Sequence, residues 1–258
     1  MKKDTSWGKF AQWYQESLQK EGSYQREVIL PNLSRVLEIK KGEIVLDLAC
    51  GEGFFSREFA KQGAGVIAVD ISRELINLAK KHSPKTIEFH VSSADNLAFL
   101  KSGSVDKVAI VLAIQNIENY NGVLKECFRV LKKGGSLAMV LSHPAFRVLK
   151  YSSWGFDSDI EFAKAAKGTQ YRRIDRYLSE AKVKIQMHPG EKPGEYTVSF
   201  HRPLQFYVKG LRNNGFLART MEEWISHKKS EPGPRSEAEN IARREMPLFL
   251  LIEAVKLE

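Results

Sequence analysis

The chain of 258 residues has few cysteines and no long apolar segment. Its two cysteines, Cys50 and Cys127, cannot form a disulfide framework, and with scattered histidines they do not favour a structural zinc site. No apolar run approaches the roughly 20 residues of a membrane-spanning helix. The first residues also lack the apolar core of a signal peptide. We therefore expect a cytoplasmic protein with reduced thiols, no bound metal and no membrane contact.

Acidic residues are in the minority, and the formal net charge is +9. Residues 147–235 hold 17 Lys and Arg against 10 Asp and Glu, so most of the excess lies there. A positive face attracts nucleic acid, membrane surfaces or anionic substrates, whereas the other interpretation is a solvated surface with interspersed signs. Blocks of like charge, typical of nucleic-acid-binding tails, are absent. Composition leaves these alternatives open.

Predicted strands and helices alternate along the first half of the chain, with short turns between them. Such alternation is typical of a parallel, doubly wound α/β sheet. After it, we expect a helix from about residue 203 and two last strands, 216–219 and 247–255, that pair antiparallel. The earlier strands are expected at 44–48, 66–69, 87–91, 105–112 and 136–141, and the earlier helices at 54–62, 74–81 and 123–130.

Two segments lie outside this alternation. Apolar residues at spacings of three and four predict helices at 6–20 and 25–37, before the first strand. Between residues 144 and 202 we expect helices at 160–166 and 171–178, then a β-hairpin of two alternating runs around a Pro-Gly turn. The expected organisation is a helical cap (1–40), a core (41–143 and 203–258) and an insertion over the sheet edge (144–202).

The most informative stretch is residues 45–56, Val-Leu-Asp-Leu-Ala-Cys-Gly-Glu-Gly-Phe-Phe-Ser. A strand, a glycine turn and a helix form the first half of a nucleotide-binding unit. The dinucleotide fingerprint G-x-G-x-x-G requires a third glycine where this chain has Ser56. Asp47 and Glu52 also make a poor environment for a pyrophosphate, but a favourable one for a ligand with an ammonium and a sulfonium group.

Two further carboxylates follow the next two strands. Asp70 closes the second strand, where a carboxylate can accept hydrogen bonds from both ribose hydroxyls. Asp95 follows the third strand and could accept one from an adenine amino group. The alternatives are helix capping for Asp70, although Ser72 is the better cap, and a surface turn for Asp95. Carboxylates at three successive strand ends favour an adenosyl ligand.

These motifs together resemble those of class I S-adenosylmethionine-dependent methyltransferases, in the type 11-like branch that acts on small molecules. The resemblance is tight over roughly residues 40–142 and includes 69–72, 93–96, 105–112 and 129–137. It implies a Rossmann-like seven-stranded sheet with an antiparallel last strand. It also implies S-adenosyl-L-methionine as cofactor and S-adenosyl-L-homocysteine as product. The implied cofactor-binding residues are Asp47, Ala49, Gly51, Gly53, Asp70, Ile71, Ala94, Asp95, Asn96, Ala113 and Gln115.

The acceptor side is less defined. After the fourth strand the family usually has His or another polar residue, and here Gln115 and Asn116 occupy that stretch. For a hydroxyl acceptor, the candidate general bases are His143 and His201, although each could be an ordinary turn histidine beside a proline. Other acceptor-side candidates are Tyr14, Asn116, Tyr171 and Arg202.

Three functions remain open from sequence. The first is methyl transfer by in-line displacement to an O, N or C atom of a small molecule, with residues 144–202 as a lid. The second is an RNA or protein methyltransferase that docks its substrate on the basic 147–235 segment. The Asn/Asp-Pro-Pro-aromatic motif of amino-directed nucleic-acid enzymes is missing at 113–116, which argues against methylation of base amines only. The third is cofactor binding without catalysis. The sequence does not predict an oligomeric state.

Overall fold

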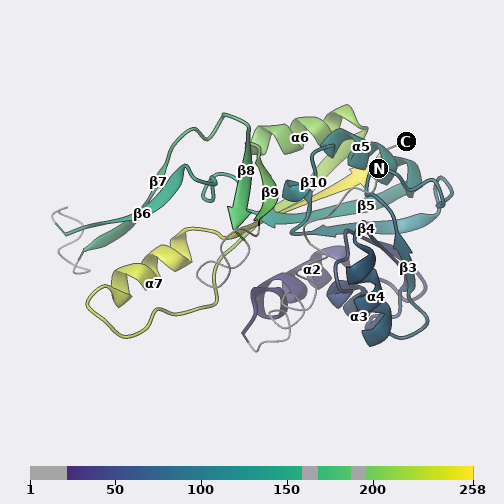
Figure 1. Cartoon of the computed structure of the whole chain (residues 1–258), viewed down its shortest axis with the longest axis horizontal. Helices are drawn as coiled ribbons and strands as arrows, with labels where there is room; N and C mark the ends of the chain where they lie inside the picture. Colours follow the sequence, from purple (N-terminus) through teal and green to yellow (C-terminus); the bar gives the residue numbers. More distant parts are fainter. Residues whose placement is uncertain (1–21, 159–167, 187–195, 258) are drawn as a thin grey trace.

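In the computed structural model, which describes residues 22–158, 168–186 and 196–257, the core is a seven-stranded sheet (Figure 1). Its strand order is β10-β11-β5-β4-β1-β2-β3. β11 runs antiparallel to both of its neighbours, whereas β1 to β5 are parallel to one another. This arrangement confirms the expected fold. The strands are β1 (Ile44–Leu48), β2 (Gly65–Asp70), β3 (Glu88–Val91), β4 (Val105–Val111), β5 (Leu131–Ser142), β10 (Phe216–Trp224) and β11 (Phe249–Lys256).

Helices cover both faces of the sheet. On one face, buried side chains of η2, α2, α3 and α4 pack against the side of β1 that carries Val45. On the other face, α5 and α6 pack against Leu46 and Leu48. Alternate residues of one buried strand thus face two cores, which explains why every residue of β1 except Asp47 is apolar. The helices are η2 (a π-helix, Gln25–Ile29), α2 (Leu30–Leu37), α3 (Phe54–Lys61), α4 (Arg73–His82), η3 (3₁₀, Ile114–Asn116), α5 (Tyr120–Val130), α6 (Leu204–Asn213) and α7 (Ser236–Glu245).

The strand order reverses between β1 and β4. β1 pairs with β2 on one side and with β4 on the other, so the connections after β1 and β4 diverge to opposite faces. Ligands of open parallel sheets bind at the carboxyl ends of the strands at such a switch point. The sequence motifs at the ends of β1, β2, β3 and β4 therefore meet at one place.

The inserted segment forms two separate antiparallel pairs, β6 (Ser152–Asp157) with β7 (Thr169–Ile174) and β8 (Ala181–Gln186) with β9 (Tyr196–His201). The β8–β9 pair confirms the expected hairpin. The helix expected at 171–178 is wrong, because its first half, 171–174, pairs with β6 as part of strand β7 and its second half is loop and turn. Its spacing of apolar residues was compatible with a helix, but the cross-strand partner, which lies far back in the sequence, decides its conformation. The helices expected at 6–20 and 160–166 lie outside the described residues.

Helix α7 is missing from the sequence prediction. It buries only small side chains, Ala238 and Ala242, so its apolar stripe is weak. Its acidic first turn and basic last turn, which complement the helix dipole, were the available signal. α7 lies beside the β6–β7 pair (Figure 1), and the Arg235 guanidinium next to its first turn lies 4.5 Å from the ring centre of Phe156. None of the helices in the described ranges has the length and hydropathy to span a bilayer.

Candidate functional site

The turn between β1 and α3 requires its glycines. Ala49, Gly51 and Gly53 all have positive φ, of 61°, 59° and 81° respectively. A Cβ atom on Gly53 would lie 3.2 Å from the Cβ of Ala79 and from the ring of Phe89. Both the left-handed backbone and this close packing favour glycine at position 53.

Asp70 fastens this turn to the end of β2. Its Oδ2 accepts a hydrogen bond from the Gly51 N–H at 2.9 Å, and its Oδ1 accepts one from the Ser72 N–H at 2.8 Å. Burial raises the pKa of the Asp70 carboxyl, while these backbone hydrogen bonds oppose the rise. Ser72 itself caps α4 by accepting from the Leu75 N–H, as predicted. The carboxylate is therefore held rigidly at the strand end, where ribose hydroxyls would meet it.

Asp47 lies beneath the turn rather than facing outward. It is only 2% exposed, and its Oδ2 accepts a hydrogen bond of 2.5 Å from the Ser56 hydroxyl. Ser56, which replaces the third glycine of the dinucleotide fingerprint, thus serves as the hydrogen-bond partner of a buried carboxyl. Burial raises the pKa of Asp47 to about 7, against the opposing effect of the Ser56 hydrogen bond.

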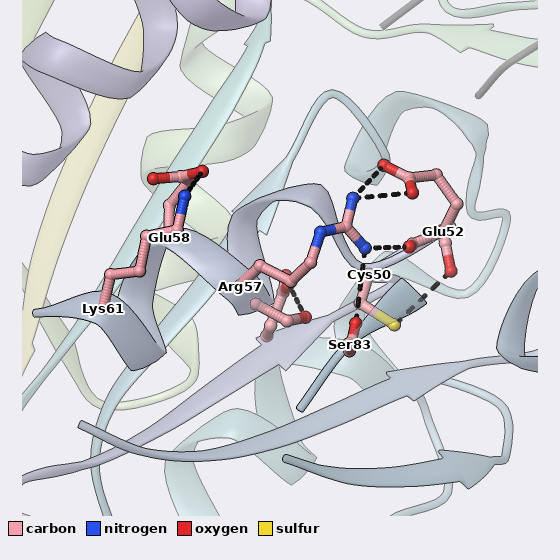
Figure 2. Close-up of polar contacts among 9 residues, drawn as sticks. Cys50, Glu52, Arg57, Glu58, Lys61 and Ser83 are labelled. Atoms are coloured by element: carbon pink, nitrogen blue, oxygen red, sulfur yellow. Dashed lines mark hydrogen bonds and ion pairs between the residues drawn. The ribbon is translucent and has the colours of Figure 1, made fainter. Parts of the chain in front are cut away.

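Glu52 is not available to a ligand. Figure 2 shows the Arg57 guanidinium placed against it, and Nη2 lies 2.9 and 2.7 Å from the two carboxylate oxygens. Arg57 Nη1 also donates to the Glu52 carbonyl at 2.8 Å and to Ser83 Oγ at 3.3 Å. The sequence suggested that the Glu52 charge faces a cationic ligand, but Arg57 of α3 neutralises it.

Asp95 connects two loops. Its Oδ1 accepts from the Ser93 hydroxyl, and its Oδ2 accepts from Asn119 Nδ2 at 2.7 Å. Asn119 in turn caps α5, since its Oδ1 accepts from the Gly122 N–H at 3.1 Å. The loops after β3 and β4 are thereby held together.

A cavity of about 790 Å³ lies where these strand ends meet. This volume is in the range of small-molecule and cofactor sites. Ile71 is 37% exposed and lines the cavity, so its apolar side chain could cover one face of an adenine ring. The sequence-predicted residues that line the cavity are Ala49, Gly51, Asp70, Ile71, Ala94, Asp95, Ala113 and Asn116.

Other predicted cofactor residues do not line this cavity. Asp47 and Gly53 support the turn from below, and the exposed Asn96 lies outside the lining. The amide of Gln115 folds back on its own turn, where Nε2 donates to the Leu112 carbonyl at 2.9 Å. Of the two polar side chains after β4, only Asn116 is placed in the lining.

Both candidate histidines lie outside the cavity lining. His143 is 2% exposed, its Nε2 donates to Glu223 Oε1 at 2.7 Å, and its Nδ1 accepts from the Ala145 N–H at 3.2 Å. Burial lowers the pKa of His143, although Glu223 opposes this change. The Nε2 of His201 donates to the Tyr177 carbonyl at 2.8 Å. Both rings are therefore held by hydrogen bonds within the fold, His143 to β10 and His201 to the segment after β7.

Arg202 supports the cavity wall. Its guanidinium donates to the carbonyls of Ile117 and Glu118 at 2.9 and 2.8 Å and lies 4.9 Å from the ring centre of Phe200. It thus fixes the loop after β4 against β9. Tyr171 lies on β7, with its ring packed over Gly155, and outside the lining. Tyr14 is outside the described residues.

The sequence prediction missed the side chains that the hairpin places over the cavity. Lys182 of β8 and Thr197, Val198 and Phe200 of β9 all line it, opposite Glu118. The alternating pattern predicted the hairpin, but no local signal showed which part of the sheet edge it would cover. In the described part of the chain, no three His, Cys, Asp or Glu side chains lie close enough to hold a metal ion.

Fold and cavity together define a Rossmann-like α/β protein with a cofactor-sized cavity at the switch point of its sheet. Residues 46–139 match a family model described as a methyltransferase domain. The chain therefore contains a methyltransferase domain, over a little more than a third of its length, and S-adenosylmethionine is the cofactor of the similar enzymes of known structure. Asp70, Asp95 and the apolar Ile71 all line the cavity, and their chemistry fits S-adenosylmethionine, with carboxylates that can accept from ribose hydroxyls and an amino group and an apolar side chain beside them in the lining.

Similar proteins agree with this family. An S-adenosylmethionine-dependent methyltransferase structure from Mesorhizobium loti is 26% identical, with a TM-score of 0.68 over 88% of this chain and 96% of that one. A putative one from Listeria monocytogenes, 24% identical, shares the fold with a TM-score of 0.65 over 88% and 97% of the two chains. A ubiquinone biosynthesis O-methyltransferase from Xanthomonas oryzae pv. oryzae is 34% identical over 99 residues. That alignment spans 37% of this chain and only 41% of the relative's length.

Proposed function

We propose that this protein transfers a methyl group from S-adenosylmethionine to a small molecule bound beneath the β8–β9 hairpin. The observation that carries the proposal is that one cavity is lined both by the cofactor motifs and by the hairpin. Asp70 and Asp95 lie at its cofactor end, and Lys182 and Phe200 of the insertion lie opposite the loop after β4. Residues 144–202 then act as a lid and acceptor-binding subdomain, and the N-terminal residues 1–40 as a cap.

The bound cofactor supplies the methyl group and a neutral thioether leaving group. The protein's own residues bind and align the reactants. Asp70 and the turn that it fastens orient the ribose, while Asn116 and the hairpin confine the acceptor. Holding two reactants in line can lower a barrier by about 7–11 kcal/mol, so alignment is the main task of this site.

The acceptor class is supported by the relatives and by the cavity. The Xanthomonas relative is a ubiquinone biosynthesis O-methyltransferase, of which 41% of the length aligns with this chain. A cavity of about 790 Å³ has room for a cofactor and a compact acceptor. We therefore favour a small molecule over a macromolecule.

Binding of S-adenosylhomocysteine tests the cofactor assignment. Saturating ligand should raise the thermal unfolding temperature of the wild type. Asp70→Ala should abolish that rise, because it removes the carboxylate at the ribose position and releases the Gly51 N–H. Asp175→Ala, which removes an exposed carboxylate paired with Arg173, is the matched control and should retain the rise. A wild type that shows no shift at saturation would refute the cofactor assignment.

A second candidate, docking of RNA on the basic 147–235 segment, has one specific observation in its favour. Trp154 on β6 is 47% exposed, and the Arg172 guanidinium of β7 lies 5.0 Å from its ring centre. Exposed aromatics beside arginines are typical of surfaces that stack single-stranded bases. This candidate predicts association with a single-stranded RNA oligomer that weakens steeply between about 50 and 200 mM salt. Absence of binding at low salt would remove it.

A further inference from the structure

We propose that Glu118 is the general base of the reaction, that Lys182 stabilises the anion it generates, and that the acceptor is a phenolic hydroxyl. This inference rests on the proposed function and specifies its acceptor. Glu118 Oε1 and Lys182 Nζ lie 3.0 Å apart, one on the loop after β4 and the other on β8. Both residues line the cavity.

The charged groups of the cavity divide into two sets. Four charged side chains belong to its lining: Asp70, Asp95, Glu118 and Lys182. Asp70 is held by the Gly51 and Ser72 N–H groups at the ribose position, and Asp95 is held by Ser93 and Asn119. The Glu118–Lys182 pair is therefore the charged set that the cofactor motifs leave for the acceptor.

The pair is placed to be opened by an incoming molecule. The side chains of Lys182 and Glu118 are 57% and 72% exposed. An ion pair this exposed contributes little to stability, so its partners can exchange for an acceptor at small cost. In contrast, the Glu118 backbone is fixed, because its carbonyl accepts from the buried Arg202 guanidinium at 2.8 Å. The Glu118 carboxylate is thus exposed on a backbone that Arg202 holds in place.

No other described side chain fits the role of base as well. His143 and His201 lie outside the lining, and their Nε2 atoms donate to Glu223 and to the Tyr177 carbonyl. Asp47 lies beneath the turn, with its carboxyl on Ser56. Among the carboxylates of the lining, only Glu118 is neither bound to the backbone of the cofactor turn nor paired with the loop after β3.

The chemistry of the pair selects a phenol. A phenolic hydroxyl has a pKa near 10, and an adjacent ammonium lowers such a value by about 1–3 units. A carboxylate can then accept the proton, whereas an aliphatic hydroxyl, with a pKa close to the 15.7 of water, is far too weak an acid. The Phe200 ring, 5.4 Å from Lys182 Nζ, and Val198 supply an apolar surface for an aromatic acceptor.

The step balances without any further reactant. The acceptor O–H gives its proton to a Glu118 carboxylate oxygen, and the oxygen's electron pair attacks the methyl carbon. The O–CH₃ bond forms as the S⁺–CH₃ bond breaks, and the electrons of that bond leave with sulfur as a neutral thioether. Glu118 then releases the proton to water through the exposed rim of the cavity.

The experiment measures formation of S-adenosylhomocysteine from S-adenosylmethionine with phenol, catechol and pyrogallol as probes, and with benzyl alcohol as the non-phenolic counterpart. The phenols should be methylated and benzyl alcohol should not. Glu118→Gln should lower kcat by about 10²–10⁴-fold, and Glu118→Asp should recover part of the loss. Lys182→Gln should raise KM. It should also move the alkaline limb of the pH–rate profile to higher pH, because the phenol loses the ammonium that lowers its pKa. Lys184→Gln, which removes the same charge from β8 outside the lining, should behave as the wild type.

A merely structural role for Glu118 would not change the shape of the pH–rate profile. With Glu118→Gln the acidic limb should move to higher pH, because the rate should then follow ionisation of the phenol itself. The neighbouring charges, Asp70, Asp95 and Lys182, are present in both proteins, so they do not account for the difference. A Glu118→Gln enzyme within about twofold of wild type, with an unchanged profile, would overturn the assignment of the base.

Failure of the acceptor class is distinguishable from failure of the proposed function. If S-adenosylhomocysteine stabilises the protein but no phenol is methylated, the phenolic acceptor is wrong and the cofactor assignment stands. If benzyl alcohol is methylated as fast as catechol, the selection argued from the pair is wrong. If S-adenosylhomocysteine does not bind, the proposed function itself fails.

Discussion

Replacing Asp47 with Asn should remove a large pH dependence of stability. The Asp47 carboxyl is 2% exposed, and its neighbours in register on β2 and β4 are Ala68 and Ala109. Its one side-chain hydrogen bond comes from Ser56. Burial raises the pKa of Asp47 from 3.8 to about 7. Asn has the same shape, can still accept from Ser56, and does not ionise.

The sign follows from proton binding. Between about pH 4 and pH 7 the folded protein holds a proton on Asp47 that the unfolded chain has lost, so stability falls as pH rises through this window. A pKa rise of about three units, at 1.36 kcal/mol each, corresponds to roughly 4 kcal/mol in total. Above about pH 7 the loss is complete and the curve flattens. For a chain of this size, roughly 4 kcal/mol corresponds to a shift of about 10 °C in Tm.

The assay is urea unfolding of the ligand-free protein at several pH values, followed by circular dichroism. The free energy of unfolding of Asp47→Asn minus that of wild type should increase by roughly 4 kcal/mol from about pH 4 to pH 8.

Asp106→Asn is a control of opposite sign. Burial raises the pKa of Asp106, but bonds from Lys132 and the Ile44 N–H outweigh it and lower the value overall. The stability that Asp106 contributes is present at neutral pH and is lost as pH falls below about 4. A difference for Asp47→Asn that does not vary with pH would refute the reasoning.

Two further outcomes concern the same turn. Glu52→Gln should lower the free energy of unfolding by about 3 kcal/mol, because it leaves the Arg57 guanidinium without its carboxylate. The control is Glu58→Gln, which breaks the exposed pair with Lys61 on the same helix (Figure 2). It should change the free energy of unfolding by less than about 1 kcal/mol. Gly53→Ala should lower the free energy of unfolding by about 1–2 kcal/mol, because residue 53 has a φ of 81°. It should also weaken S-adenosylhomocysteine binding, measured by thermal shift and calorimetry.

Much of the core was readable from the sequence because its signals are local. Apolar runs of four to eight residues bounded by turns predicted β1 to β4 to within one residue at each end. The start of β5 was wrong, because that strand begins at Leu131 and was expected to begin at residue 136. Parallel strands end at the same edge, so Asp70 and Asp95 could be expected at one site before any contact was known. The resemblance then named the family and its cofactor, and the comparisons agree with it.

Charge in the glycine turn was a less reliable guide. The sequence places Glu52 between two glycines, which suggests a free carboxylate for a cationic ligand. The structure instead pairs it with Arg57, one turn into α3, and buries Asp47 on Ser56. Each partner is less than ten positions away, but a pairing of this kind depends on rotamers that no residue pattern specifies.

The sequence by itself determined the alternating core, the positions of the glycine turn and the carboxylates at successive strand ends, because periodicity and turn chemistry act over a few residues. Only the tertiary structure decided that β7 is a strand, that β11 lies between β5 and β10, and that the β8–β9 hairpin brings Lys182 to Glu118. These outcomes depend on pairing between segments that are distant in the chain, where burial and hydrogen bonding of a whole surface outweigh local preference. The strand-end carboxylates of the cavity were therefore visible in the sequence, and the hairpin side chains that line it were not.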